Sequence, residues 1–129
     1  MNWYGSVENR IAETMTGRPE PKIGLGGYLS FWSDRQPYYI ENIDYYKNGN
    51  IKSLKLVEPI YRHKGEAYMG NNNWDIETWE QTKSRIDKGE PLRRETVKKT
   101  RGGKWTTDGT KKGTPYLIGK VEKYYDYEY

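Results

Sequence analysis

Two runs rich in aromatic and β-branched residues, 38–46 and 51–57, are separated by only four residues, and Asn48-Gly49 lies between them. Asn and Gly tolerate the positive φ angles that the tight turns of antiparallel hairpins require. An Asn-Gly pair between two such runs is therefore the strongest short-range indication of a β-hairpin. This part of the chain is predicted to form two antiparallel strands.

Further strands are expected on both sides of this hairpin. The run 28–32 is short and aromatic, and 116–118 is apolar. A second hairpin is predicted where 96–100 meets 104–106 across a Gly-Gly pair. We see no internal repeat and no linker, so residues 1–129 are expected to form one β-rich domain.

A helix is predicted near the start of the chain. Asn2 can cap it, and Gly17 and Pro19 would end it. Apolar residues recur between them at four-residue spacing, which places them on one helical face: Trp3, Val7, Ile11 and Met15. The predicted fold class is therefore α+β, a small domain of antiparallel hairpins with an N-terminal helix.

The segment 74–89 fits two structures. Asp75 could cap a helix that ends at Gly89, whereas the β-branched and aromatic content of 76–79 suits a strand equally well. Local rules leave both alternatives open.

The composition favours a core built from a few large side chains. Only 33% of the residues are hydrophobic, but 13 are Tyr and 5 are Trp. Each aromatic ring can bury roughly 150–250 Å², so a core needs fewer of them. There is no Cys, which excludes disulfides and thiolate metal sites. No run approaches the roughly 20 apolar residues of a membrane span, so we expect a cytoplasmic protein without a membrane partner.

Positive charge is concentrated in the second half of the chain. The net charge is +4, but the segment 83–123 alone holds 13 Lys or Arg against 5 Asp or Glu. A field of that sign favours anionic partners such as nucleotides, nucleic acid or an acidic protein face. An ordinary solvated surface is the alternative interpretation.

Enzyme chemistry has little support in the sequence. The one imidazole, His63, lies in a predicted loop without a neighbouring carboxylate or second ligand. Ser and Thr are plentiful, but a hydroxyl nucleophile needs a positioned base. We therefore expect a protein that is not an enzyme and carries neither metal nor cofactor.

The segment 24–37 combines glycines, aromatics and one Arg. Its glycines invite comparison with phosphate loops, but no Gly-Lys-Ser/Thr follows and the next residues favour a strand. A glycine-rich bend that enters the sheet explains them better. Arg35 lies in a predicted turn beside Trp32 and Tyr38, where its planar fork can bind phosphate or stack on a ring. A structural pair of Arg35 with Asp34 is the alternative.

The segments 24–37, 103–105 and 119–129 together resemble a widespread group of small phage-encoded proteins. That group carries a Gly-x-Gly segment leading into Trp-Ser-Asp-Arg-x-Pro-Tyr, a late Asn-Gly-Arg-Trp and a Tyr-rich end. This chain departs from the pattern at 27–28, 56–58 and 102–104, so its ligand or affinity can differ. In size and Arg-plus-aromatic content it is also similar to phage anti-defence sponges, which sequester cyclic ADP-ribose-type signals of the Thoeris system.

The second resemblance implies a homo-oligomeric protein of the host cytoplasm that binds a small anionic nucleotide without turning it over. A diphosphate would pair with cationic side chains from Arg35, Arg93, Arg94 and Lys120. Its base would stack on Trp32, Tyr38 or Trp105, and Asp34 would hold ribose hydroxyls.

Two other functions remain open from the sequence. In one, a small basic β-rich module binds nucleic acid, with Trp105 stacking on bases and phosphates tracked by Arg93, Arg94, Lys98, Lys99, Arg101 and Lys104. In the other, the protein inhibits a host protein through its aromatic and Arg side chains.

Overall fold

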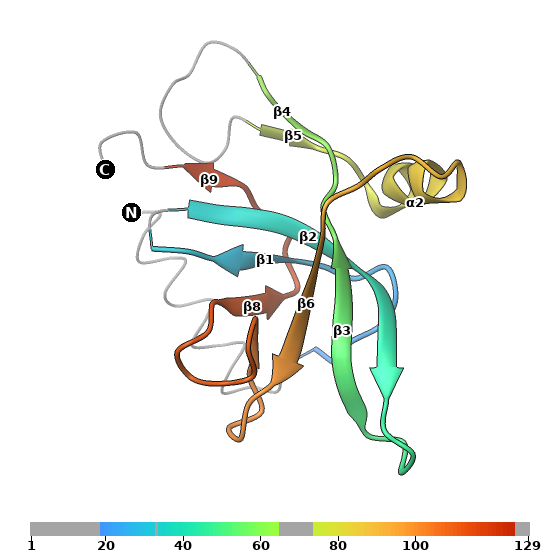
Figure 1. Cartoon of the computed structure of the whole chain (residues 1–129). Helices are drawn as coiled ribbons and strands as arrows, with labels where there is room; N and C mark the ends of the chain where they lie inside the picture. Colours follow the sequence, from blue (N-terminus) through green and yellow to red (C-terminus); the bar gives the residue numbers. More distant parts are fainter. Residues whose placement is uncertain (1–18, 33, 65–73, 126–129) are drawn as a thin grey trace.

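The computed structural model describes residues 19–32, 34–64 and 74–125. Six strands form an antiparallel barrel, in the order β1-β8-β7-β6-β3-β2, and β2 pairs back with β1 (Figure 1). Their bounds are Gly26–Ser30 (β1), Asp34–Tyr45 (β2), Ile51–Val57 (β3), Arg94–Lys99 (β6), Trp105–Thr106 (β7) and Pro115–Ile118 (β8). The short strand β9 (Tyr124–Tyr125) pairs with the first two residues of β2, beside the barrel.

A second, two-stranded sheet and one helix lie near the end of the barrel that is away from the hairpin turns (Figure 1). The strands are β4 (Tyr61–His63) and β5 (Trp74–Ile76), and the helix is α2 (Trp79–Asp87). The segment 74–89, for which the sequence allowed a helix or a strand, therefore contains both: a strand at 74–76 and a helix at 79–87. The helix begins where Thr78 and Gln81 form a capping box, in which each side chain bonds the other residue's backbone N–H.

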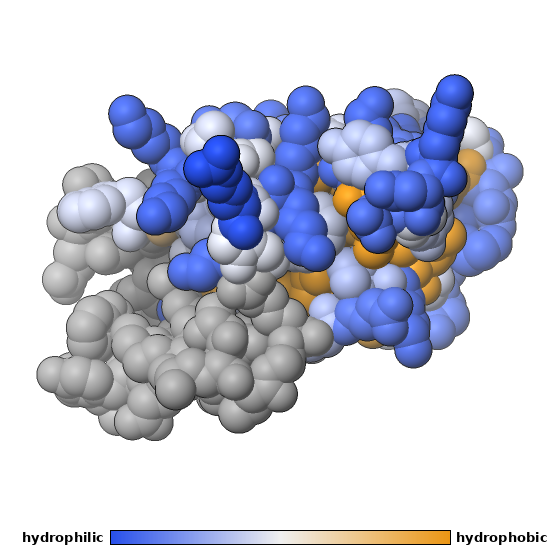
Figure 2. Space-filling view, turned by 90° about the horizontal axis from the view of Figure 1, so that it is seen from below, coloured by the Kyte–Doolittle hydropathy of each residue, from blue (hydrophilic) through white to orange (hydrophobic). Residues whose placement is uncertain are grey.

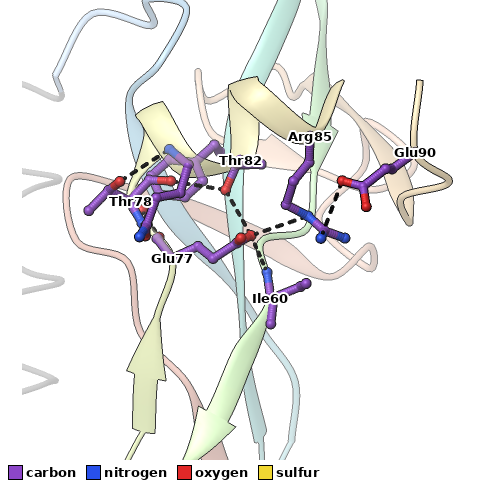
Figure 3. Close-up of polar contacts among 8 residues, drawn as sticks. Ile60, Glu77, Thr78, Thr82, Arg85 and Glu90 are labelled. Atoms are coloured by element: carbon purple, nitrogen blue, oxygen red, sulfur yellow. Dashed lines mark hydrogen bonds and ion pairs between the residues drawn. The ribbon is translucent and has the colours of Figure 1, made fainter. Parts of the chain in front are cut away.

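Glu77 joins α2 to the rest of the molecule (Figure 3). Its Oε1 accepts hydrogen bonds from the backbone N of Ile60 at 2.8 Å and from Oγ1 of Thr82 at 3.4 Å. Arg85 Nε lies 3.7 Å from the same oxygen. The backbone carbonyl of Glu77 accepts a hydrogen bond from the Tyr39 hydroxyl on β2. One residue thus links the helix, the segment before β4 and the barrel.

The interior of the barrel is filled by side chains that alternate along the strands, as the two-residue period of a strand requires. The buried cluster consists of Leu29, Tyr38, Ile40, Leu54, Leu56, Val97, Trp105, Tyr116 and Ile118. Three of the nine are aromatic, which fits the expectation of few, large core residues. The Tyr116 hydroxyl donates a 2.8 Å hydrogen bond to the Tyr38 carbonyl, so its buried polar end is satisfied.

Both predicted hairpins are confirmed. The β2–β3 pair turns at Gly49 with φ 89°, and the β6–β7 pair turns at Gly103 with φ 82°. The predicted strand at 116–118 is also present, within β8. The predicted N-terminal helix lies outside the described residues, as do residues 126–129 of the Tyr-rich end.

Two local expectations are corrected. The aromatic strand begins and ends two residues earlier than predicted, so Phe31 and Trp32 follow β1 and are 44% and 86% exposed. His63 is not a solvated loop residue, because it belongs to β4 and meets the Trp74 ring edge-on at 5.0 Å.

Gly24 lies in the turn that precedes β1, which fits a glycine-rich bend entering the sheet, and the three glycines at 24, 26 and 27 also allow close packing. A Cβ on Gly27 would lie 2.3 Å from the Leu117 carbonyl oxygen and 2.8 Å from the Tyr116 ring. A Cβ on Gly24, whose φ is +96°, would lie 2.9 Å from the Trp79 indole. The absence of side chains lets β1 approach β8 and α2 closely.

We expect Gly27→Ala to lower the free energy of unfolding by about 1–3 kcal/mol or more, because a backbone oxygen cannot move aside cheaply. Gly102→Ala is the matched control: its nearest atom, Thr100 Oγ1, would be 3.9 Å away. The control should change stability by less than about 0.5 kcal/mol. Urea denaturation of both variants measures the difference, and equal stability would contradict the close approach.

Candidate anion-binding groove

An open groove of about 1750 Å³ lies at the end of the barrel where the hairpins turn. Its walls come from the β2–β3 turn and its flanks at 46–52, from the end of β6 and its turn at 98–100 and 102–103, and from residues 19–21. Trp105 also contributes to the lining. Figure 2 views the molecule from this end and shows hydrophilic side chains projecting around exposed hydrophobic residues.

Four lysines line the groove: Lys47, Lys52, Lys98 and Lys99. Within the part of the chain that the structure describes, none of the four forms an ion pair with a carboxylate. Two carboxylates, Glu20 and Asp108, share the lining. The groove therefore carries a positive excess of uncompensated charge.

The Asp108 carboxylate is committed to its own loop. Its Oδ1 accepts hydrogen bonds from the backbone N of Thr110 at 2.8 Å and from Oγ1 of Thr110 at 2.9 Å. These bonds hold the pKa of Asp108 below its ordinary value, because they favour the ionised form. Asp108 thus shapes its own loop, next to Lys98, and remains ionised.

Tyrosine side chains are presented at the same end. Tyr46 lines the groove and is 54% exposed, and its neighbour Tyr45 is 59% exposed. The Tyr46 backbone is fixed by the turn: its N–H donates to the Asn50 carbonyl at 2.8 Å, and its carbonyl accepts from the Gly49 N–H at 3.0 Å. An ordered turn therefore carries an exposed ring beside the lysines.

Trp105 belongs to the groove but does not offer a free ring face. It is only 6% exposed, and Lys99 Nζ lies 5.9 Å from the ring centroid. Tyr38 is likewise a core residue, 4% exposed. The prediction that these two rings stack on a base is therefore wrong for the observed structure, because both rings are used to fill the barrel.

Each of the predicted cations lies near a carboxylate. Arg94 makes a two-bond pair with Glu41, at 2.8 and 3.0 Å. Arg35 forms an ion pair with Glu122 and stacks over the Tyr28 ring at 5.3 Å, which leaves its side chain 15% exposed. Arg35 therefore has a structural partner, but both local predictions for it are wrong: it lies in β2 and not in a turn, and its ion pair is with Glu122 and not with Asp34.

The other predicted residues lie near a cluster at the opposite end of the barrel. Lys120 Nζ is 3.9 Å from Glu122. Asp34 lies close enough to Lys123 to oppose the fall in that residue's pKa. Arg93 lowers the pKa of Tyr38, against the larger effect of burial. Each of these side chains therefore has an oppositely charged residue nearby.

Lys123, at the end of the barrel opposite the groove, is a buried cation that the sequence did not indicate. It is 4% exposed, and its Nζ lies 5.4 Å from the Tyr61 ring centroid and 5.3 Å from that of Trp74. Burial lowers the pKa of Lys123 and raises that of Glu58. Since the contacts join three distant segments, no local pattern could have revealed them.

Comparisons with known proteins give no match: no family model fits the chain, and no curated protein or solved structure is significantly similar to it. Among the described residues, no group of three or more His, Asp or Glu side chains is placed to hold a metal ion. No helix in the described ranges has the length and apolarity to cross a bilayer. The groove is therefore assigned from its own geometry.

Burial raises the pKa of Tyr38 from 10.0 to about 12, and the carboxylates of Glu58 and Glu95 add to the effect. An unfolded chain loses this proton first as pH rises, so the contribution of Tyr38 to stability is intact below pH 10 and lost between pH 10 and 12. We expect Tyr38→Phe to reduce the alkaline loss of stability by on the order of 1–2 kcal/mol.

Urea denaturation on both sides of pH 10 measures this change in the two proteins. Other buried tyrosines, such as Tyr116, also have a raised pKa, so part of the alkaline loss should persist in the variant. An unchanged pH profile in Tyr38→Phe would show that this hydroxyl is not buried.

Proposed function

We propose that this protein binds nucleotide phosphates in the hairpin-end groove and does not change them chemically. The observation that carries the proposal is the set of four groove lysines without carboxylate partners among the described residues. Ammonium groups bind phosphate oxygens as mobile point charges. Tyr46, exposed on the adjoining turn, supplies a ring for a base.

The contrast between the two barrel ends supports this location. At the far end, Arg35 and Lys120 share Glu122, and Lys123 lies near Glu58 and Asp34. An anion arriving there would have to compete with carboxylates that are already in place. At the hairpin end, the lysines gain counterions only when an anion binds, so binding relieves their mutual repulsion.

The resemblance to small phage proteins supports a role in which binding itself is the activity. A protein that retains a nucleotide immune signal lowers its free concentration in the host cytoplasm and needs no catalytic group. In this form, the protein is a homo-oligomeric anti-defence sponge for a cyclic ADP-ribose-type signal. Nucleic acid is the second candidate, because the groove is open along its length and not enclosed.

The test is retention of cyclic ADP-ribose and of a short oligothymidylate by the intact protein at low salt. We expect the double variant Lys52→Ala/Lys98→Ala to bind at least about tenfold more weakly, which corresponds to about 1.4 kcal/mol. Lys83→Ala is the matched control, because Lys83 is on α2 and already pairs with Asp87 at 3.1 Å. Isothermal titration calorimetry measures the affinities.

Bound ligand should return chemically intact when the protein is heat-denatured, as shown by mass spectrometry. Cleaved ligand would identify an enzyme. If neither ligand is retained, or if the double variant and the control bind equally, the groove is not the site and the proposal fails.

A further inference from the structure

We propose that the ligand of the groove is a single strand of nucleic acid, bound through backbone charge and base stacking without sequence preference. This inference rests on the proposed function, phosphate binding in the same groove, and selects the second of its two candidate ligands, nucleic acid, over a cyclic ADP-ribose-type signal. It depends on the size of the groove, the distribution of its cations and the exposure of its rings.

The groove is large and open. Small-molecule sites are typically enclosed clefts of about 300–1,000 Å³ that surround most of their ligand. The groove here measures about 1750 Å³ and is walled by turns from two hairpins. One free nucleotide would leave much of this space and much of the lysine array without contact, whereas an extended strand would occupy both.

The cations extend over two hairpins. Lys47 and Lys52 flank the β2–β3 turn, and Lys98 and Lys99 end β6. The pairing of Ser53 with Lys98 holds the two hairpins side by side. Beyond the groove lining, the β6–β7 turn adds two more exposed cations, Arg101 and Lys104. Six cations on two adjoining hairpins suit a ligand with several phosphates in a row.

Exposed rings accompany this charge. Tyr45 and Tyr46 are both more than half exposed, and the turn hydrogen bonds of Tyr46 come from its backbone. A ring held in this way can stack on any unpaired base, because every base has a π-face. In a duplex those faces are covered by neighbouring bases, so the rings favour a single strand.

The experiment measures binding of the full chain to fluorescently labelled oligothymidylates of about 4, 8, 12 and 16 nucleotides, a length range typical of single-strand sites. We expect affinity to rise with length until the groove is filled, and to fall at least tenfold between about 50 and 200 mM salt. Cyclic ADP-ribose and a duplex of matched length should each bind at least about tenfold more weakly than the longer strands.

Tyr46 separates base stacking from charge alone. Tyr46→Ala should weaken oligothymidylate binding by roughly tenfold but leave the affinity for inorganic polyphosphate unchanged, while Tyr46→Phe should retain both. Circular dichroism of both variants verifies the fold. Because the Tyr46 ring is exposed and makes no turn hydrogen bond of its own, we expect both variants to fold.

Three results would overturn the inference. Cyclic ADP-ribose binding as tightly as the longest strand would leave the proposed function standing and make the ligand a free nucleotide. Duplex binding as tight as single-strand binding, or an unchanged affinity in Tyr46→Ala, would show recognition of charge alone. If no anion binds, the proposed function fails as well.

Discussion

The close approach of β1 to its two neighbours is the constraint on which the barrel depends. β1 pairs with β2 through Gly26–Ser30 and with β8 through residues 27–29, and this double pairing closes the sheet. Gly27 leaves room for the Tyr116 ring, whose hydroxyl reaches the Tyr38 carbonyl on β2. With the sheet closed, β3 and β6 are held together, and their turns meet at one end. The groove lies where these turns meet.

An aromatic core has a consequence for function. A chain that is only 33% hydrophobic uses large rings to fill its interior. Trp105 and Tyr38 are therefore used to fill the barrel and are not available to a ligand. The rings left for a ligand are those at hairpin tips, where strands end and side chains no longer face the core. Tyr45 and Tyr46 lie at such a tip, beside the lysines.

The sequence predicted those structures that are determined by residues close together along the chain. Asn48-Gly49 and the Gly pair at 102–103 indicated both hairpins, because turn chemistry is local. The pairing of Arg35 with Glu122 joins residues 87 positions apart, and that of Tyr116 with Tyr38 joins residues 78 apart. No periodicity encodes such contacts, so barrel closure and the roles of the core rings required the structure.

Some residues of the candidate site were likewise predicted from the sequence, and others became apparent only in the structure. The lysines at 98–99 were predicted as possible phosphate contacts from the basic second half of the chain. Lys47 and Lys52 were not, because they lie in a different hairpin about half a chain away. Only the β3–β6 pairing brings the two pairs to one groove.

The two ends of the barrel differ in whether their cations have carboxylate partners. At the far end, Lys123 is buried, yet it lies near Asp34 and Glu58, and Arg35 is paired with Glu122. These contacts offset the cost of desolvating charged groups, so they serve the fold. Lys47, Lys52, Lys98 and Lys99 gain nothing comparable, since like charges in one groove repel each other. Such a surface is suited to an anionic ligand, because the negative charge of the ligand would neutralise lysines that have no carboxylate partner in the described part of the fold.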